Sequence, residues 1–357
     1  MTTAPLHVRA AFFVFAAEKN TLGRAYALWL AAEELGWETR FVAPRIDDPW
    51  SPLVGEHGFV ARLTADGDQA AAWADVLVAL KPWPGALDVA LRLGRVYDKP
   101  VAVDVDDPDW ENEYGWSAAR QALTFATLTC SGRRPLGAYR LRYTASRLER
   151  VLVSNPALQR WYRRGVVVPH ARPARPPGRP HSATGTDIEV AFVGTVAEHK
   201  GVEVLREAAK AAGDVRLVLT AEAPPDARPN ERWIGRTTLE EGLAVIDTCD
   251  VVAVPSQPWV YGAGQLPVKL IDAMIAGRAV VASDLGPARW ALAGTGLLVP
   301  PGDAVALGDA LKRLRSSSLR SELGQAARLR ALQRFTPAAV AHDLAAGLGF
   351  GDPLEAS

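Results

Sequence analysis

The chain has 357 residues, which is more than one hydrophobic core usually supports, so we expect two domains. Apolar residues make up 48% and charged residues 22%, as in soluble globular proteins and unlike disordered ones. The 40 basic and 40 acidic side chains cancel, so the net charge indicates neither nucleic acid nor an acidic partner.

The cysteines and the N-terminus bear on the cellular compartment. Cys130 and Cys249 are far apart and lie in apolar patterns, which favours a reducing cytoplasm over a disulfide framework. The N-terminal apolar run is short and charged on both sides, so it predicts a first buried strand rather than a signal peptide. No apolar stretch approaches the roughly 20 residues that span a bilayer. We therefore expect a cytoplasmic protein that is not integral to a membrane.

The first half alternates short apolar runs with helical patterns. Strands are predicted at 8–17, 39–44, 76–80, 101–105, 151–156 and 166–169, and helices at 20–36 and 86–98. This alternation is typical of parallel βαβ units.

A single stretch, ARPARPPGRPHSATGT at 171–186, has the composition of a linker. The alternation restarts after it. Strands are predicted at 188–194, 215–220, 250–255, 279–283 and 297–303, and helices at 200–213, 238–249, 266–277, 303–315, 319–334 and 335–348. The fold class is therefore α/β, with two doubly wound parallel-sheet halves. Ligands of such sheets bind at the carboxyl ends of the strands, and an interdomain cleft is the expected site.

Two glycine-bearing turns in the second half suit an anion. In AFVGTVAEHKG a strand runs into the Gly194 turn, and a helix begins near Lys200. A helix N-terminus offers free N–H groups and a partial positive charge, and Lys200 adds a full charge. Taken alone this signal is weak, because most such turns bind nothing.

The stretch VPSQPWVYGAGQLPVK places Gly262 and Gly264 just before a helix whose first turn contains Lys269. Asp272 follows three residues later on the same helix face. The two charges are explained either by a surface ion pair or by a carboxylate that accepts hydrogen bonds from ligand hydroxyls. Spacing alone leaves both interpretations open.

Residues 252–286, VAVPSQPWVYGAGQLPVKLIDAMIAGRAVVASDLG, resemble the nucleotide-sugar signature of GT-B glycosyltransferases of family 4. AFVGTVAEHKG resembles the phosphate motif of the same family, and GTGLLVPPGD its following strand and loop. The resemblance implies two Rossmann-like domains, an acceptor-side domain at 1–170 and a nucleotide-sugar domain at 187–334. It further implies that the last helix, within 335–357, crosses back to the first domain.

Carried over by position, the resemblance implies that Asp272 binds the ribose hydroxyls of a nucleotide diphosphate sugar. It implies that Lys200 binds the diphosphate. The donor-binding residues that it implies are Gly194, Thr195, Lys200, Gly262, Ala263, Gly264, Gln265, Lys269 and Asp272. Two positions depart from the family pattern. Thr195 stands where the family has an arginine and Gly264 where it has a first glutamate, while Lys269 is a candidate substitute for the missing cation.

The resemblance places the acceptor in the first half, near Asn20, Gly23 and Arg24. Arg24 suits an anionic acceptor, although a solvated helix arginine explains it equally. The family loop at this place is glycine-rich, and only Gly23 matches it.

The segment VAVDVDDPDW contains a cluster of acids. Residues two apart on a strand face the same side, so Asp104 and Asp106 resemble the D-x-D metal motif of a different glycosyltransferase fold. The family resembled here is metal-independent, so we expect no metal. Asp106 and Asp107 are then candidate catalytic residues that orient sugar or acceptor hydroxyls. The alternative is that they are plain strand-end aspartates without such a role.

The segment from Arg120 to Pro180 is strongly basic, with thirteen arginines, no lysine and one acid. Its part at 133–150 suits peripheral contact with an anionic membrane at the inner face. A solvated face that balances the preceding acids is the competing explanation.

The resemblance implies a hexosyltransferase-type glycosyltransferase (EC 2.4) of carbohydrate biosynthesis that uses no cofactor. It would move a sugar from a nucleotide diphosphate sugar to an unidentified sugar, lipid-linked or small-molecule acceptor with retention of configuration. Three alternatives remain open. They are a catalytically inactive homologue that acts as a binding partner, a nucleotide-sugar epimerase and a membrane-surface binding protein.

Overall fold

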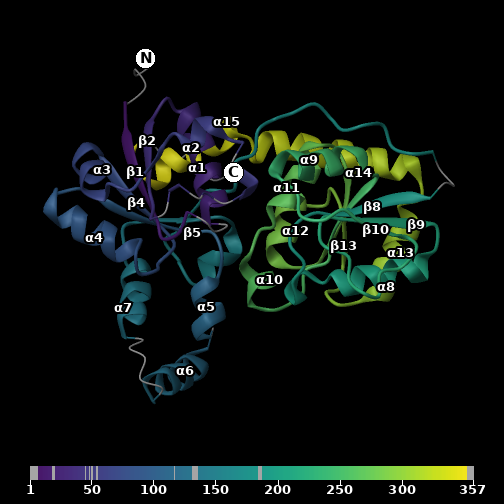
Figure 1. Ribbon diagram of the computed structural model, residues 1–357, viewed down its shortest axis with the longest axis horizontal. Helices are drawn as coiled ribbons and strands as arrows, with labels where there is room; N and C mark the ends of the chain where they lie inside the picture. Colours follow the sequence, from purple (N-terminus) through teal and green to yellow (C-terminus); the bar gives the residue numbers. More distant parts are fainter. Residues whose placement is uncertain are drawn as a thin grey trace. The chain divides into compact units, whose positions relative to one another are not determined.

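The computed structural model describes residues 7–17, 21–44, 46–47, 49, 51–53, 55–115, 117–130, 136–183 and 187–351. The chain divides into two compact units (Figure 1). Unit 1 comprises 1–171 together with 337–357, and unit 2 comprises 172–336. Each unit is built on one parallel sheet. The expected α/β fold with two doubly wound parallel sheets is confirmed.

The sheet of unit 1 has seven parallel strands in the order β3-β2-β1-β4-β5-β6-β7. The strands are β1 (Arg9–Val14), β2 (Glu38–Val42), β3 (Leu63–Thr64), β4 (Val76–Leu80), β5 (Val101–Val105), β6 (Arg150–Val153) and β7 (Val166–Val167). β4 is buried along its whole length, because helices cover both faces of a parallel sheet. The strand order reverses between β1 and β4, which is where doubly wound sheets bind ligands.

Helices surround this sheet and extend beyond it. They are α1 (Thr21–Glu34), α2 (His57–Val60), α3 (Gly67–Trp73), α4 (Leu87–Val96), α5 (Asp109–Tyr114), α6 (Ala118–Cys130), α7 (Leu136–Ala145) and α15 (Pro337–Gly347), with the 3-10 turns η1 (Ser51–Leu53) and η2 (Pro156–Arg160). The final helix α15 packs beside α1 within unit 1 (Figure 1). In contrast, α6 has no buried residue and lies away from the sheet.

The sheet of unit 2 has six parallel strands in the order β10-β9-β8-β11-β12-β13. The strands are β8 (Ile188–Phe192), β9 (Val215–Leu219), β10 (Glu231–Trp233), β11 (Val251–Val254), β12 (Ala279–Ser283) and β13 (Leu297–Val299). The helices are α8 (Val202–Ala212), α9 (Leu239–Thr248), α10 (Val260–Gly264), α11 (Val268–Ile275), α12 (Gly286–Leu292), α13 (Ala304–Arg313) and α14 (Ser317–Arg334), with η3 (Glu198–Lys200). Here the strand order reverses between β8 and β11.

Two apolar clusters form the core of unit 2, one on each face of its sheet. α8 and α13 cover one face, with Leu205 and Leu311 fully buried. α11 and α14 cover the other, with Ile271, Met274 and Ala327 fully buried (Figure 1). The apolar spacing of α11 in the sequence is thus the spacing of its buried face.

The segment predicted as a linker contains neither helix nor strand among its described residues, 171–183. It nevertheless lies close against unit 2. The N–H of Gly178 donates to the Ala276 carbonyl, that of Arg179 to the Asp247 carbonyl and that of Ser182 to the Asp250 carboxylate. These bonds fix the path of the segment, which its proline- and arginine-rich composition did not reveal.

The structure adds elements that the sequence patterns did not predict. The strands β3 and β10 are two and three residues long, too short for a periodicity to show. The stretch expected as a glycine loop contains the short helix α10. The basic segment overlaps α6 and contains α7. No helix among the described residues is both long and apolar enough to cross a membrane.

Candidate functional site

The loop after β8 lies at the place where the strand order of unit 2 reverses. Gly194 has a φ of 116°, in a region that glycine adopts readily, and its N–H donates to the Thr220 hydroxyl at 2.7 Å. Gly201 has a φ of 69° and precedes α8. A Cβ on Gly201 would overlap the Pro255 carbonyl oxygen, so glycine lets this loop lie against the loop after β11.

The two loops meet through a cation. The Lys200 ammonium donates to the side-chain oxygen of Gln265, the residue directly after α10. Close by, a Cβ on Gly262 would overlap the Gln257 carbonyl oxygen. The structure therefore brings Lys200 and Gln265 together from positions 65 residues apart, and it requires a glycine at 262.

The second cation comes from the first turn of α11. The half-buried Lys269 places its ammonium 3.5 Å from the centroid of the Phe192 ring, a cation–π contact at the end of β8. Among the described residues no carboxylate pairs with Lys269. Burial, and then the charge of Lys200, hold the pKa of Lys269 well below its usual value.

His199 completes what we call the cation cluster, Lys200, Lys269 and His199. Its ring stacks on that of Tyr261, with centroids 5.1 Å apart. Burial lowers the pKa of His199, and the charges of Lys200 and Lys269 lower it further. The two lysines thus disfavour protonation of His199, and Lys200 disfavours protonation of Lys269, so an anion bound among them would favour the protonated forms.

Backbone groups support the same conclusion. No side chain caps the N-terminus of α11, whose first turn carries Lys269, and none caps α8. Free N–H groups at a helix N-terminus bind phosphate and other anions. The described part of unit 2 therefore has a cation cluster and an uncapped helix end at the carboxyl edge of its sheet. Of the other predicted donor residues, Thr195 is exposed, Ala263 is half-buried and Gly264 is buried.

Asp272 lies one turn along α11, and its partner is not Lys269. Its buried carboxylate accepts hydrogen bonds from Arg172, with Nε 2.6 Å from Oδ1 and Nη2 3.2 Å from Oδ2. The interpretation of Lys269 and Asp272 as a surface ion pair is therefore wrong. The Arg172 pair by itself explains why the carboxylate can be buried, and it leaves lone pairs on both oxygens for further donors.

Arg24, in unit 1, has a structural environment that the sequence did not reveal. Its guanidinium is 1% exposed and donates to both Asp104 oxygens, at 3.0 and 2.7 Å, and to the carbonyls of Val168 and Pro169. Arg24 is therefore neither a solvated helix arginine nor available to an anionic acceptor, because its guanidinium N–H groups already donate within unit 1. Gly23 is half-buried on α1, and Asn20 lies outside the described residues.

The acidic segment is organised around a lysine that the sequence analysis did not single out. Lys81 directly follows β4, and its ammonium pairs with Asp106 at 3.3 Å, with Asp107 at 3.7 Å and with Asp109 through a hydrogen bond. Asp104 is taken up by Arg24. The D-x-D interpretation, in which Asp104 and Asp106 share a cation, is therefore wrong. Asp106 and Asp107 do lie at the carboxyl edge of the sheet.

Several arginines of the basic segment are used within unit 1. Arg142 pairs with Glu111 at 2.8 Å and lies over the Tyr162 ring at 4.0 Å, and Arg150 donates to the Leu348 carbonyl. Arg142 thus balances one of the preceding acids, as the competing explanation expected, but from a mostly buried position. Arg133 and Arg134 lie outside the described residues.

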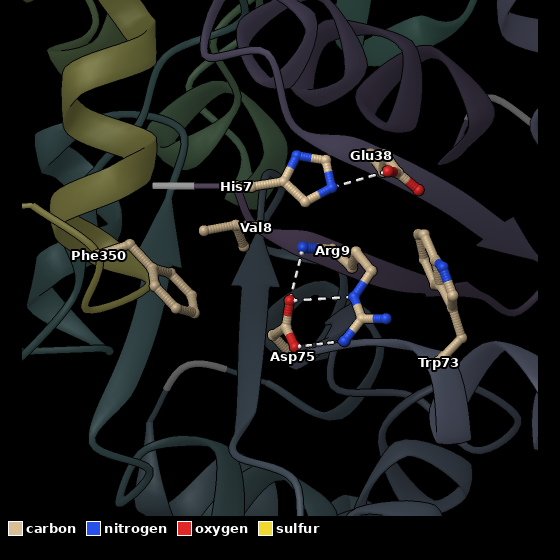
Figure 2. Close-up of a pocket in the computed structure, with 7 residues that line it drawn as sticks. All are labelled: His7, Val8, Arg9, Glu38, Trp73, Asp75 and Phe350. Atoms are coloured by element: carbon tan, nitrogen blue, oxygen red, sulfur yellow. Dashed lines mark hydrogen bonds and ion pairs between the residues drawn. The ribbon is translucent and has the colours of Figure 1, made fainter. Parts of the chain in front are cut away.

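A cavity of about 380 Å³ lies at the edge of the unit 1 sheet opposite to Asp106 and Asp107 (Figure 2). It is lined by His7, Val8, Arg9, Glu38, Trp73, Asp75 and Phe350. Its polar side chains pair with one another, Arg9 with Asp75 at 3.0 Å and His7 with Glu38 at 2.8 Å (Figure 2). Arg9 and Glu38 begin their strands, so this cavity is at the amino edge, away from the strand ends that carry the other groups.

The sequence of unit 2 resembles a known family. Residues 187–317, most of unit 2, match the family described as glycosyl transferases group 1. A phosphatidyl-myo-inositol mannosyltransferase of Mycobacterium leprae (strain TN) is 30% identical over 170 residues, which cover 43% of this chain and 44% of that protein. The chain thus spans less than half the length of this curated relative.

Solved structures show the same fold over nearly the whole chain. Anabaena HepE in complex with UDP and glucose has a TM-score of 0.65 at 15% identity, covering 96% of this chain and 100% of that one. Sucrose-phosphate synthase from Thermosynechococcus elongatus has a TM-score of 0.64 at 18% identity, covering 94% and 96%. The similarity supports the two-unit GT-B architecture.

Proposed function

Because residues 187–317 belong to the glycosyl transferases group 1 family, we propose that the chain transfers a glycosyl group from a nucleotide diphosphate sugar to an acceptor hydroxyl. The observation that carries the proposal is the cation cluster of unit 2. Lys269 faces no carboxylate among the described residues, and it lies in the uncapped first turn of α11. Such a site suits a diphosphate better than a neutral sugar.

The chemistry that we propose breaks the bond between the sugar C1 and the diphosphate oxygen. A new bond forms from C1 to the acceptor oxygen, and the acceptor proton leaves to the departing diphosphate. Negative charge develops on that diphosphate, where Lys200, Lys269 and the first-turn N–H groups of α11 stabilise it. Fixed charges aimed at developing charge are usually the largest catalytic contribution. No metal ion is needed in this scheme.

Asp272 and the two unit 1 aspartates have separate proposed roles. Asp272, held by Arg172, accepts hydrogen bonds from the ribose hydroxyls of the donor. Asp106 and Asp107, at the carboxyl edge of the other sheet, orient sugar or acceptor hydroxyls. The relatives suggest which hexosyl donors to test first. The curated one is named a mannosyltransferase, and HepE was solved with UDP and glucose.

The test is release of nucleoside diphosphate from a panel that includes UDP-glucose and GDP-mannose, with monosaccharide and inositol-containing acceptors. Acceptor-dependent release that Lys200→Met abolishes supports the proposal. Conversion of the donor to an isomer without acceptor would instead identify an epimerase.

A second candidate function rests on Thr195 and Gly264, which replace a cation and an acid of the family pattern. The chain would then bind a nucleotide sugar without turning it over and serve as a partner to an active enzyme. Tight donor binding with no release under any acceptor would favour this candidate.

A further inference from the structure

Lys81 is held in a position that is costly for a lysine. It is the residue after β4, its φ of 77° lies in the left-handed region, and it is 5% exposed. A non-glycine residue in this region is strained, and such residues cluster at functional sites. The N–H of Lys81 donates to the Asp104 carbonyl on neighbouring β5 at 2.8 Å, which fixes the unusual backbone.

Three carboxylates surround the Lys81 ammonium, and we call Asp106, Asp107 and Asp109 the carboxylate triad. Asp106 and Asp107 come directly after β5, which pairs with β4, and Asp109 begins α5. One oxygen of each lies within 4.8 Å of the others. Asp106 and Asp107 are 5% and 8% exposed, so the triad is not a solvated surface cluster.

The electrostatics keep the ammonium charged. Burial lowers the pKa of Lys81, but the three carboxylates outweigh it and hold the pKa well above the usual lysine value. Burial likewise raises the pKa of Asp106, and Lys81 is the first of the groups that bring it below its usual value. His170 and then Arg24 also lower the pKa of Asp106, and Arg24 is already paired with Asp104. Lys81 is therefore the first of the charges that keep Asp106 ionised, and its ammonium also contacts Asp107 and Asp109.

Converging carboxylates at the carboxyl edge of a sheet are a common way to hold a divalent cation. Here an ammonium from the chain itself occupies the point of convergence. We propose that Lys81 is a built-in replacement for a divalent metal ion, a positioning residue that holds Asp106 and Asp107 in the orientation they need toward hydroxyls of the sugar or acceptor. The role toward hydroxyls rests on the proposed function, whereas the replacement of a metal does not.

The test removes the ammonium and asks whether a metal takes its place. Lys81→Gly suits this, because glycine adopts the φ of 77° without strain and leaves space for an ion and its waters. Mn²⁺ binding is measured by electron paramagnetic resonance without nucleotide. We expect one Mn²⁺ per chain in Lys81→Gly, bound roughly 100-fold more tightly than by the unaltered protein. Adding Asp109→Asn to Lys81→Gly should abolish this increase in Mn²⁺ affinity.

Asp98→Gly is the matched control, since Asp98 is another non-glycine residue with positive φ and is not in the triad. It should gain no Mn²⁺ site. If Lys81→Gly unfolds without metal, Mn²⁺ should restore its circular dichroism, and Lys81→Arg, which keeps the charge, should fold without metal. A folded Lys81→Gly that binds Mn²⁺ no better than the unaltered protein, or an unfolded one that Mn²⁺ does not restore, would overturn the proposal.

The positioning role has its own readout. With a donor and acceptor that support turnover, Lys81→Gly should lose turnover in EDTA and regain part of it with Mn²⁺, while UDP binding to unit 2 stays unchanged. Turnover that is unaffected by Lys81→Gly would overturn the positioning role. Absence of UDP binding to the unaltered protein would instead count against the proposed function, so the two failures are distinguishable.

Discussion

The Lys269 ammonium lies 3.5 Å from the centroid of the Phe192 ring and has no carboxylate partner among the described residues. The aromatic face partly offsets the loss of water around the charge, but it does not neutralise it. The structure thus makes the protonated form of Lys269 costly, since a second lysine, Lys200, lies near it. That arrangement destabilises the unliganded chain and favours an anion.

The first prediction concerns how stability changes with pH. The folded-state pKa of Lys269 is well below the unfolded value of about 10.5. Between these two values the unfolded chain binds more protons than the folded one, so the contribution of Lys269 to stability rises with pH. Lys269→Met should therefore be more stable than the unaltered protein near pH 7, and the difference should shrink toward pH 10.

Urea unfolding at several pH values measures this difference. The pKa of His199 is also lowered, but this changes the unfolding free energy only below the usual histidine pKa. The change in stability above pH 7.5 therefore reports on Lys269. Lys312→Met is the control, because Lys312 is exposed and pairs with Asp309. A stability difference that does not vary with pH would contradict the assignment.

The second prediction separates the two roles of the Arg172–Asp272 pair. Arg172→Met leaves a buried carboxylate without its partner and should cost about 3–5 kcal/mol of unfolding free energy. A double variant, Arg172→Met with Asp272→Leu, should recover much of that loss. Asp272→Asn should weaken binding of UDP but not of inorganic pyrophosphate, which has no ribose. Equal affinities of Asp272→Asn and the unaltered protein for UDP would remove the ribose role.

The third prediction concerns Arg24 and Asp104. Both are almost fully buried and hydrogen-bonded to each other, so Arg24→Met should destabilise the protein by about 3–5 kcal/mol. Where the variant remains folded, its affinity for UDP should be unchanged, because Arg24 belongs to unit 1 and the cation cluster to unit 2. Unaltered stability together with a lost response to an anionic acceptor would restore the earlier interpretation of Arg24.

Most of the strands and about half of the helices were predictable. Buried parallel strands are continuous apolar runs, and the longer helices repeat apolar residues at helical spacing. The ranges 76–80 and 101–105 agree with β4 and β5 at both ends. The final helix was predicted because its apolar spacing begins at a proline, which suits the first turn of a helix. Local pattern is enough for such elements, since each one shows its buried face in its own sequence.

The side-chain partners were not predictable, for the opposite reason. Arg172 meets Asp272 across 100 residues, and Lys81 meets Asp109 across 28. Neither pair has a spacing that a local pattern reveals. In the sequence analysis the acids are identified and assigned ligand hydroxyls, with a metal only as a weighed alternative, because the sequence offers no means of finding the cations that already bind them. A lysine directly after a predicted strand, as at Lys81, was the available signal.

The fourth prediction concerns the glycine-bearing loop before α11, which includes the short helix α10 with Gly262. An added Cβ at Gly262 would overlap the Gln257 carbonyl oxygen and lie 2.9 Å from Leu285 Cδ1, so Gly262→Ala must displace the loop. We expect a loss of about 1–3 kcal/mol in stability and weaker binding of UDP. Gly137→Ala in α7 is the control, since its Cβ meets no atom within 4 Å. Unchanged binding and stability in Gly262→Ala would show that the loop tolerates the displacement.

The most direct test of the central claim is calorimetric titration of UDP and GDP into the unaltered protein, Lys269→Met and Lys200→Met. Each variant should lose roughly tenfold or more in affinity. Binding to the unaltered protein should take up protons, seen as a heat that depends on the ionisation enthalpy of the buffer, because the anion raises the pKa of Lys269. Lys269→Met should lose most of this uptake. Affinities that remain the same in both lysine variants, with no proton uptake, would contradict the claim that the cation cluster binds a diphosphate.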